Sequence, residues 1–390
     1  MRFSYITRNI FYLSLISFFT DVASEMLYPV IPLYLSAIGI SVSGIGIIEG
    51  IAETLSALSK TYFGIMSDRL KKRKIFIIIG YGLSAISKPF MIVFSNYFWI
   101  LFMRLSDRLG KGIRTAPRDA LLSDESVESN KGKVFGFHRS IDTLGAAVGP
   151  AITLILLSFY HWHYTELFIL AIIPGILTII ISLFIKEKKQ HQFSLRKIKW
   201  QDLLAYWKIS SYSYKIVTVL LILFYLFNSS DMLLLLKAQT HSSVQDSQVI
   251  LLYIIYNISY ALFAFPFGII GDKIGLRNTI AIGLLFFGFT YIGITYFESW
   301  EALISLFILY GIYSAAIEGN IKALLSNLSE KEYTATAIGL FTTLQSFTFI
   351  ISNSLAGFLW ENFNSSLPFI LSGCVSILVS ILLILIPLKR

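Results

Sequence analysis

The chain consists of long apolar stretches that follow one another with short polar interruptions. A stretch of about 20 apolar residues is the length that an α-helix needs to cross the hydrocarbon core of a bilayer. Each such stretch must be helical, because lipid offers no partner to an exposed backbone amide. The pattern predicts about twelve membrane-spanning helices, at residues 9–38, 42–66, 74–95, 97–122, 132–159, 164–185, 214–236, 247–271, 277–297, 300–325, 334–358 and 364–387.

One polar and basic stretch, residues 186–213, divides the predicted helices into two sets of six. We therefore expect an N-terminal six-helix half at 1–185 and a C-terminal half at 214–390. The dividing stretch contains Trp200 and Trp207 among several lysines. It is either an amphipathic helix in the lipid headgroup region or a flexible tether, and the sequence leaves both interpretations open.

Composition and charge agree with a membrane protein. The mean hydropathy is +0.71 and 14% of the residues are charged, against roughly 25% in soluble domains. The formal net charge is +9, and the positive residues gather in "DRLKKRK", in the 118–133 loop, in the central stretch and in the terminal "LKR". The loops on the opposite side contain one lysine, Lys237, and no arginine. The positive-inside rule then places both termini in the cytoplasm, without any need for a nucleic-acid partner.

A short segment occurs twice in the same register. "GIMSDRLKKRK" ends the second predicted helix of the first half, and "GIIGDKIGLRN" ends the second predicted helix of the other half. The matching residues, each pair 204 positions apart, are Gly64 with Gly268, Asp68 with Asp272 and Arg73 with Arg277. A repeated six-helix unit is typical of secondary transporters.

With this repeat, the sequence resembles the major facilitator superfamily over its whole length. Gly64, Asp68, Arg69, Arg73 and Lys74 are similar to the superfamily's signature loop between helices 2 and 3. The resemblance implies twelve helices in two pseudo-symmetric halves. It also implies that Asp68, and by the repeat Asp272, helps to gate the opening towards the cytoplasm. The alternative is a solvated turn at the lipid headgroups.

Two further segments extend the resemblance. "RLSDRLGKG" resembles the helix-4 pattern, in which Arg104 and Arg108 compete for one role. "LGAAVGPAI" resembles the helix-5 motif of drug/proton antiporters, with Gly145, Gly149 and Pro150 at the matching positions, although the double glycine after the proline is missing. The alternative for the two glycines is close helix packing without any bearing on transport direction.

Charged residues inside the predicted helices are costly in lipid and therefore mark either function or pairing. The candidates for proton coupling or a substrate cavity are Asp21, Glu25, Glu49, Glu53, Arg108, Arg139, Asp142 and Asp231. All except Asp231 lie in the N-terminal half. Some of these charges are expected to form proton or substrate sites, and others to neutralise each other and hold helices together. Arg108 with Asp107 and Arg139 with Asp142 are the expected pairs of the second kind.

Asp21 and Glu25 are the strongest candidates for coupling to protons. They are four residues apart, which places both on one face of a helix, and no cation lies near them on that helix. A carboxyl group in such a dry environment readily holds a proton. Glu53 and Asp142 come next. His138 is either a proton relay or a hydrogen-bonding residue within the bundle.

We predict a secondary active transporter that moves a small solute by alternating access, coupled to protons, with export favoured over import. A proton-coupled importer of a metabolite or ion and a ligand sensor without transport are the alternatives. The sequence contains no P-loop, HExxH or GxSxG, which argues against an ATP-driven pump and against an enzyme. We expect no cofactor and no metal site. The expected partners are the substrate, protons and the bilayer, and the expected location is the bacterial inner membrane, as a monomer.

Overall fold

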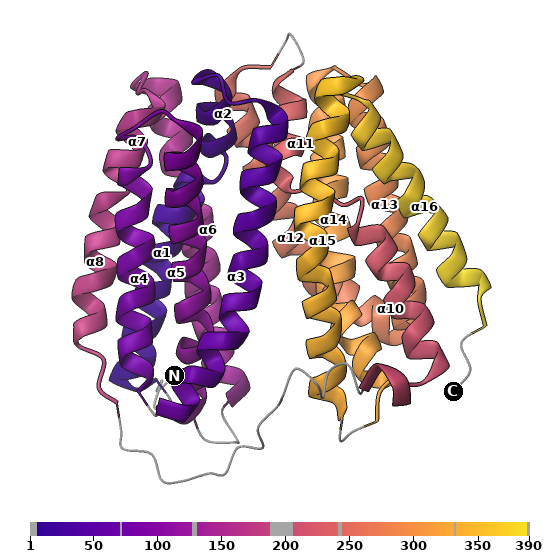
Figure 1. Ribbon diagram of the computed structural model, residues 1–390, viewed down its shortest axis with the longest axis horizontal. Helices are drawn as coiled ribbons and strands as arrows, with labels where there is room; N and C mark the ends of the chain where they lie inside the picture. The colour runs from indigo at the N-terminus through magenta and orange to yellow at the C-terminus, as the bar shows by residue number, and fades with distance from the viewer. Residues whose placement is uncertain are drawn as a thin grey trace. The chain divides into compact units, whose positions relative to one another are not determined.

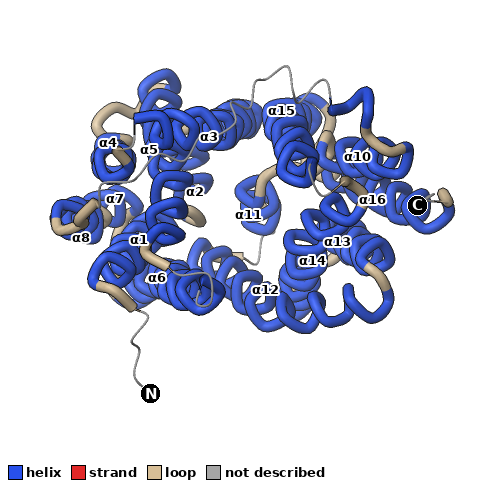
Figure 2. The backbone as a smooth tube through the Cα atoms, turned by 90° about the horizontal axis from the view of Figure 1, so that it is seen from below, coloured by secondary structure: helices blue, strands red, loops and turns tan. Residues whose placement is uncertain are grey.

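The structure is a computed structural model that describes residues 6–70, 72–126, 131–187, 206–240, 244–330 and 333–387. Every regular element in these ranges is a helix (Figure 2), which confirms the all-α prediction. The chain forms two compact units, which we call the N-terminal unit (Met1–Ile40 with Ile51–Phe193) and the C-terminal unit (Ser41–Gly50 with Ser194–Arg390). Residues 188–205 of the central stretch and the terminal "LKR" lie outside the described residues.

Each predicted span coincides with one helix or with two consecutive helices (Figure 1). The first six spans correspond to α1 Arg8–Leu27, α2 Val30–Ala37, α3 Val42–Leu70, α4 Arg73–Phe90, α5 Tyr97–Asp124, α6 Lys131–Phe159, α7 Tyr164–Leu170 and α8 Ile172–Leu183. The other six correspond to α10 Tyr212–Tyr225, α11 Asp231–Gln239, α12 Asp246–Ile274, α13 Leu276–Tyr296, α14 Trp300–Asn327, α15 Thr334–Asn362 and α16 Leu367–Leu385.

The first span of each unit is broken, and the sequence explains both breaks. Pro29 stands between α1 and α2, and its missing N–H removes a helical hydrogen bond at that point. In the other unit, Ser230 precedes α11, and its Oγ accepts a hydrogen bond from the backbone N–H of Met232 at 3.2 Å. A serine that caps a new helix satisfies a donor that would otherwise have no partner.

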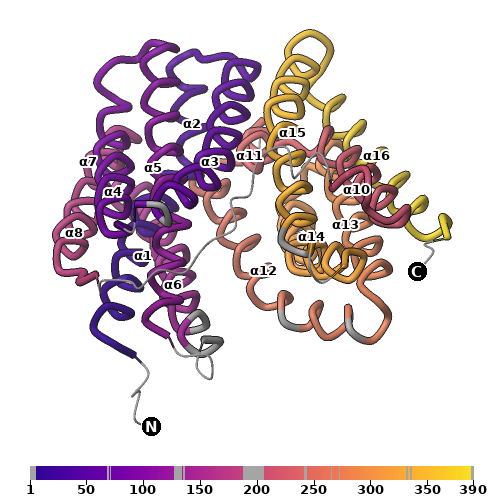
Figure 3. The backbone as a smooth tube through the Cα atoms, turned by 60° about the horizontal axis from the view of Figure 1, so that its bottom comes forward, coloured from indigo at the N-terminus to yellow at the C-terminus, as the bar shows by residue number. Residues whose placement is uncertain are grey.

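The two units have the same internal packing. In the N-terminal unit α1 packs on α6 and α8, and α4 packs on α5 and α8; Figure 3 shows α1 beside α6. In the C-terminal unit the corresponding helices pair in the same way, α10 with α15 and α16, and α13 with α14 and α16. The repeat seen in the sequence is therefore a repeat of helix packing, and the two halves are pseudo-symmetric as predicted.

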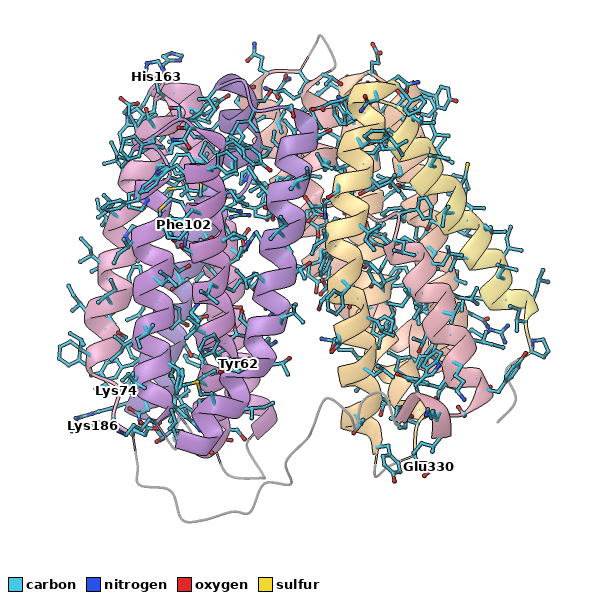
Figure 4. The ribbon with its side chains drawn as sticks, in the orientation of Figure 1. Tyr62, Lys74, Phe102, His163, Lys186 and Glu330 are labelled. Carbon is cyan, nitrogen blue, oxygen red and sulfur yellow. The ribbon has the colours of Figure 1, made fainter. Side chains whose placement is uncertain are left out.

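The surface of the helices is suited to lipid. Eight helical segments in the described chain are long and apolar enough to cross a membrane, and large apolar side chains such as Phe98 (79% exposed) and Phe159 (77% exposed) point outward. A soluble monomer rarely exposes so much apolar surface. Figure 4 places Lys74 and Lys186 at one end of the N-terminal unit and His163 at the other end, as expected for one basic and one neutral face.

Candidate functional site: a charged pocket in the N-terminal unit

The site is organised by a row of cations along α5. Asn96 caps this helix by accepting a hydrogen bond from the N–H of Trp99 at 2.9 Å. The cations that follow, spaced three or four residues apart, are Arg104, Arg108, Lys111, Arg114 and Arg118. That spacing keeps them near one face of the helix, and a rise of about 1.5 Å per residue spreads them over roughly 21 Å. One face of α5 is thus a basic stripe inside the helical bundle.

Asp107 neutralises the charge at the start of this stripe, at Arg104. It forms ion pairs with Lys88 of α4 at 2.8 Å and with Arg104 at 3.4 Å, and it accepts a hydrogen bond from Ser84 Oγ. The side chains of Lys88 and Asp107 are only 5% and 7% exposed. We had expected Asp107 to pair with Arg108, but Arg108 pairs with Glu53 of α3 at 2.9 Å. Helix periodicity places residues on a face but does not choose between two adjacent cations.

A small pocket opens between α1, α4 and α5 beside these pairs. Its volume is about 30 Å³, which is enough for two water-sized atoms. Five cations and three acids line it, namely Lys88, Arg104, Arg108, Lys111, Arg114, Asp21, Glu25 and Asp107. Asp21 and Glu25 therefore do face cations, although these come from α5 and not from their own helix. Arg108 also lies 5.9 Å from the ring centre of Tyr28, a cation–π contact.

Beside this pocket two acids meet. The carboxyl groups of Asp21 of α1 and Asp142 of α6 lie close enough to act on each other electrostatically. Asp142 also accepts hydrogen bonds from Ser17 at 2.5 Å and from Arg139 at 3.0 Å, so the predicted Arg139–Asp142 pair is confirmed. Arg118 donates in turn to Ser17 Oγ at 2.9 Å. Two buried carboxylates this close to each other repel when both are ionised, which makes the pair a candidate site for a proton.

The other predicted residues lie elsewhere. Glu49 is buried (2% exposed) in the first part of α3, which belongs to the C-terminal unit. The side chain of Arg139 is 68% exposed. Asp231 is in the C-terminal unit, where it accepts a hydrogen bond from Tyr310 Oη at 2.5 Å. His138 is buried, with Nδ1 3.3 Å from Ser14 Oγ, a bond within the bundle that matches one of its two interpretations.

Basic residues of the repeated signature segments bond to the ends of neighbouring helices. Lys74 Nζ donates to the carbonyl of Leu183 at the end of α8 at 2.7 Å, and Arg73 pairs with Asp124 of α5 at 2.7 Å. In the C-terminal unit Arg277 donates to three carbonyls at the end of α16, those of Leu383, Ile384 and Ile386. In both units a basic residue of the segment thus satisfies the last carbonyls of the sixth span.

The remaining residues of these segments do not all behave alike. A Cβ added to Gly64 would lie 2.9 Å from Ala116 of α5, so this glycine permits close packing. Nothing described lies within 4 Å of a Cβ added to Gly268, so this counterpart of Gly64 in the C-terminal unit has no such contact. The side chains of Asp68, Arg69 and Asp272 lie outside what the structure describes.

The helix-5 glycines bring α6 close to α1. A Cβ on Gly145 would be 2.5 Å from the carbonyl oxygen of Phe18, and one on Gly149 would be 2.7 Å from the backbone of Val22 and Met26. Pro150 follows inside the helix and is buried. Because Asp21 and Asp142 lie on these two helices, the glycines set the distance across which the two carboxyl groups meet.

Sequence reasoning did not anticipate an aromatic cluster in the C-terminal unit. Tyr256, Tyr291 and Tyr313 lie 4.9–6.1 Å from the ring of Tyr310, which donates to Asp231. The residues come from α12, α13 and α14. With 21 tyrosines in the chain, no spacing distinguishes these from the aromatic residues that face lipid.

Two halves with the same helix packing, an apolar outer surface and a charged pocket among the helices of one half define a multi-pass membrane transporter. The chain belongs to the Major Facilitator Superfamily, whose family model matches residues 13–243 and again 217–390. This confirms the resemblance seen in the sequence, and the family is one of transporters, not an enzyme class.

Individual proteins agree with this assignment. A protein of Methanocaldococcus jannaschii, named as an uncharacterized MFS-type transporter, is 35% identical over 386 residues, which cover 98% of this chain and 95% of the relative. A homologue of the multi-drug resistance efflux pump PmrA from Lactococcus lactis is 20% identical over 331 residues, which cover 83% of this chain and 81% of the pump. The crystal structure of the nucleoside transporter NupG has a TM-score of 0.81 at 14% identity, covering 97% of this chain and 98% of that one, and supports the fold.

Proposed function

We propose that the protein is a secondary active transporter that works by alternating access between its two halves and is driven by protons. The observation that carries the proposal is the close approach of two acids on facing helices, Asp21 of α1 and Asp142 of α6, where Gly145 and Gly149 bring the two backbones together. When neither acid carries a proton, two negative charges face each other across the contact between these helices. Like charges repel strongly in a dry site.

Proton release therefore changes the stability of the α1–α6 contact. After release, Asp142 keeps its bonds to Ser17 and Arg139, and Asp21 is the group left to move or to find a new partner. Lys111 of α5 acts electrostatically on Asp21 and is the partner we propose. A switch of Asp21 from α6 towards α5 would couple the proton to a rearrangement of helices, as a two-state element requires.

For the direction of transport we favour export in exchange for protons. The similarity to the Lactococcus lactis efflux pump homologue supports this direction. A second candidate, cotransport of a proton with an anion, is favoured by the excess of cations over acids around the pocket. We further propose that Asp68 and Asp272 gate the cytoplasmic opening, and that the protein is a monomer of the bacterial inner membrane with both termini in the cytoplasm.

Transport in proteoliposomes tests the coupling. Asp21→Asn and Asp142→Asn keep shape and hydrogen-bonding capacity but remove titration. Each variant should still exchange labelled ethidium at equal pH on both sides, and should fail to concentrate it under an imposed pH gradient. Asp246→Asn is the matched control, because Asp246 bonds to Gln239 in the C-terminal unit at 2.8 Å. Accumulation by both acid variants at the rate of the control would show that the coupling proton is held elsewhere.

A further inference from the structure

The pocket between α1, α4 and α5 contains more positive charge than its acids balance. Five cations and three acids line it, and Glu53, which pairs with Arg108 from outside the lining, brings the acids to four. Asp107 is already engaged with Lys88 and Arg104. At least one cation of the pocket is therefore in excess, and the excess grows when Asp21 carries a proton.

Arg114 is the cation of the pocket whose charge the acids do not balance. Its side chain is buried, with the residue 5% exposed, and its Nη1 has no hydrogen-bond partner among the residues that the structure describes. Its guanidinium group lies 4.6 Å from the ring centre of Tyr81, a contact that stabilises the positive charge but uses none of its N–H donors in the plane. A buried guanidinium with an unused donor is costly unless an anion meets it.

We infer that the pocket binds a carboxylate group of the transported solute, held by Arg114 together with Lys111. This inference rests on the proposed function and assigns its substrate class. A guanidinium group presents parallel N–H donors that match the two oxygens of a carboxylate, whereas lysine supplies a point charge. The volume of about 30 Å³ accommodates two atoms of the size of a water oxygen, which matches the two oxygens of a carboxylate and leaves the rest of the solute outside.

The same geometry argues against a cationic head group in this place. An ammonium group in the pocket would meet two acids, Asp21 and Glu25, but also three cations, Arg108, Lys111 and Arg114, while Asp107 is occupied by its own ion pairs. Like charges in a site of low dielectric repel. The acids of the pocket thus serve to offset part of the basic stripe, and the unmet charge selects for an anion.

Asp21 links this site to the proton. The charged groups that act on Asp21 are Asp142 from α6, Glu25 from α1, and Lys111 and Arg114 from α5. An ionised Asp21 competes with the carboxylate for the two cations, whereas a protonated Asp21 leaves both to the ligand. Carboxylate and proton therefore bind together, as in the second candidate of the proposed function, cotransport of a proton with an anion.

Ligand-induced stabilisation of the purified full-length protein tests the site. Thermal unfolding in detergent is followed with sodium benzoate, with benzyltrimethylammonium chloride as a cation of similar size, and with sodium chloride for ionic strength, at mildly acidic and at neutral pH. Benzoate should raise the unfolding midpoint, more at mildly acidic pH, and the ammonium salt should not. Arg114→Gln should lower the affinity of the protein for benzoate at least tenfold. Arg114→Lys keeps the charge without the parallel donors and should weaken it less.

Arg8→Gln is the matched control, because Arg8 is exposed at the start of α1 and distant in sequence from the pocket, and it should bind benzoate like the natural protein. Arg114→Lys also keeps the test valid if Arg114→Gln does not fold. Benzoate binding that is equal in the natural protein and in either Arg114 variant would overturn the inference, as would the absence of any benzoate effect at both pH values. If a pH gradient concentrates benzyltrimethylammonium in proteoliposomes while benzoate stabilises the purified protein at neither pH, the inference fails while proton-coupled transport stands.

Discussion

Asp107→Asn tests whether the acids of the basic stripe hold the helices together. The change preserves the shape of the side chain and removes its charge, so that Lys88 and Arg104 lose the carboxylate that they share at 2.8 and 3.4 Å. Lys88 and Asp107 are 5% and 7% exposed, so bulk solvent does not replace the lost partner. Removing one partner of a buried ion pair costs about 3–5 kcal/mol, and we expect the free energy of unfolding to fall by this amount.

Lys88→Met should cost less. Asp107 then keeps Arg104 and the hydrogen bond from Ser84, so no isolated charge remains, and we expect a loss of roughly 1–3 kcal/mol, typical of a broken charged hydrogen bond. The double variant, Asp107→Asn with Lys88→Met, should lose less free energy of unfolding than the sum of the two single losses. The reason is that no lysine charge is left without a partner once Lys88 has been replaced. A double-mutant cycle isolates this coupling.

The assay is equilibrium unfolding in mixed micelles of mild detergent and sodium dodecyl sulfate, followed by helix content. Asp119→Asn is the matched control, since Asp119 pairs with Arg118 at 2.9 Å but is 40% exposed, and a pair of that kind contributes about 0–1 kcal/mol. Equal losses for Asp107→Asn and Asp119→Asn would refute the reasoning. So would a double variant whose loss equals the sum of the single losses.

Two further predictions concern packing and helix ends. Gly145→Ala places a Cβ 2.5 Å from the carbonyl oxygen of Phe18, a backbone atom that cannot rotate away, and should lower stability by about 1–3 kcal/mol; Gly82→Ala, with nothing described within 4 Å, should be neutral or stabilising by up to about 1 kcal/mol. Identical unfolding midpoints for the two alanine variants would contradict this. Arg277→Gln removes donors to the last carbonyls of α16 and should speed hydrogen exchange at the end of that helix, whereas Lys273→Gln, an exposed position, should leave it unchanged.

The sequence by itself determined the helices, because a bilayer imposes a length and an apolar composition on every segment that crosses it. The repeat of Gly-x-x-x-Asp and a later arginine determined that there are two related halves. The break after α1 was not predicted, because the apolar pattern predicts one helix over residues 9–38; Pro29, which cannot continue the hydrogen bonding of a helix, explains it. These features are local, and each follows from the residues of one segment.

The partners of the buried charges were decided only by the tertiary structure. The sequence placed Asp21 and Glu25 on one face of a helix but did not say which helix they face, and it paired Asp107 with its neighbour Arg108. In the folded protein Asp107 pairs with Lys88 of α4, and Glu53 pairs with Arg108 of α5. Asp21 lies close to Asp142. A helical period fixes the direction of a side chain relative to its own axis. Which charge it meets depends on how the neighbouring helices are packed and rotated, and close approaches such as Gly145 against Phe18 set that packing between residues far apart in the chain.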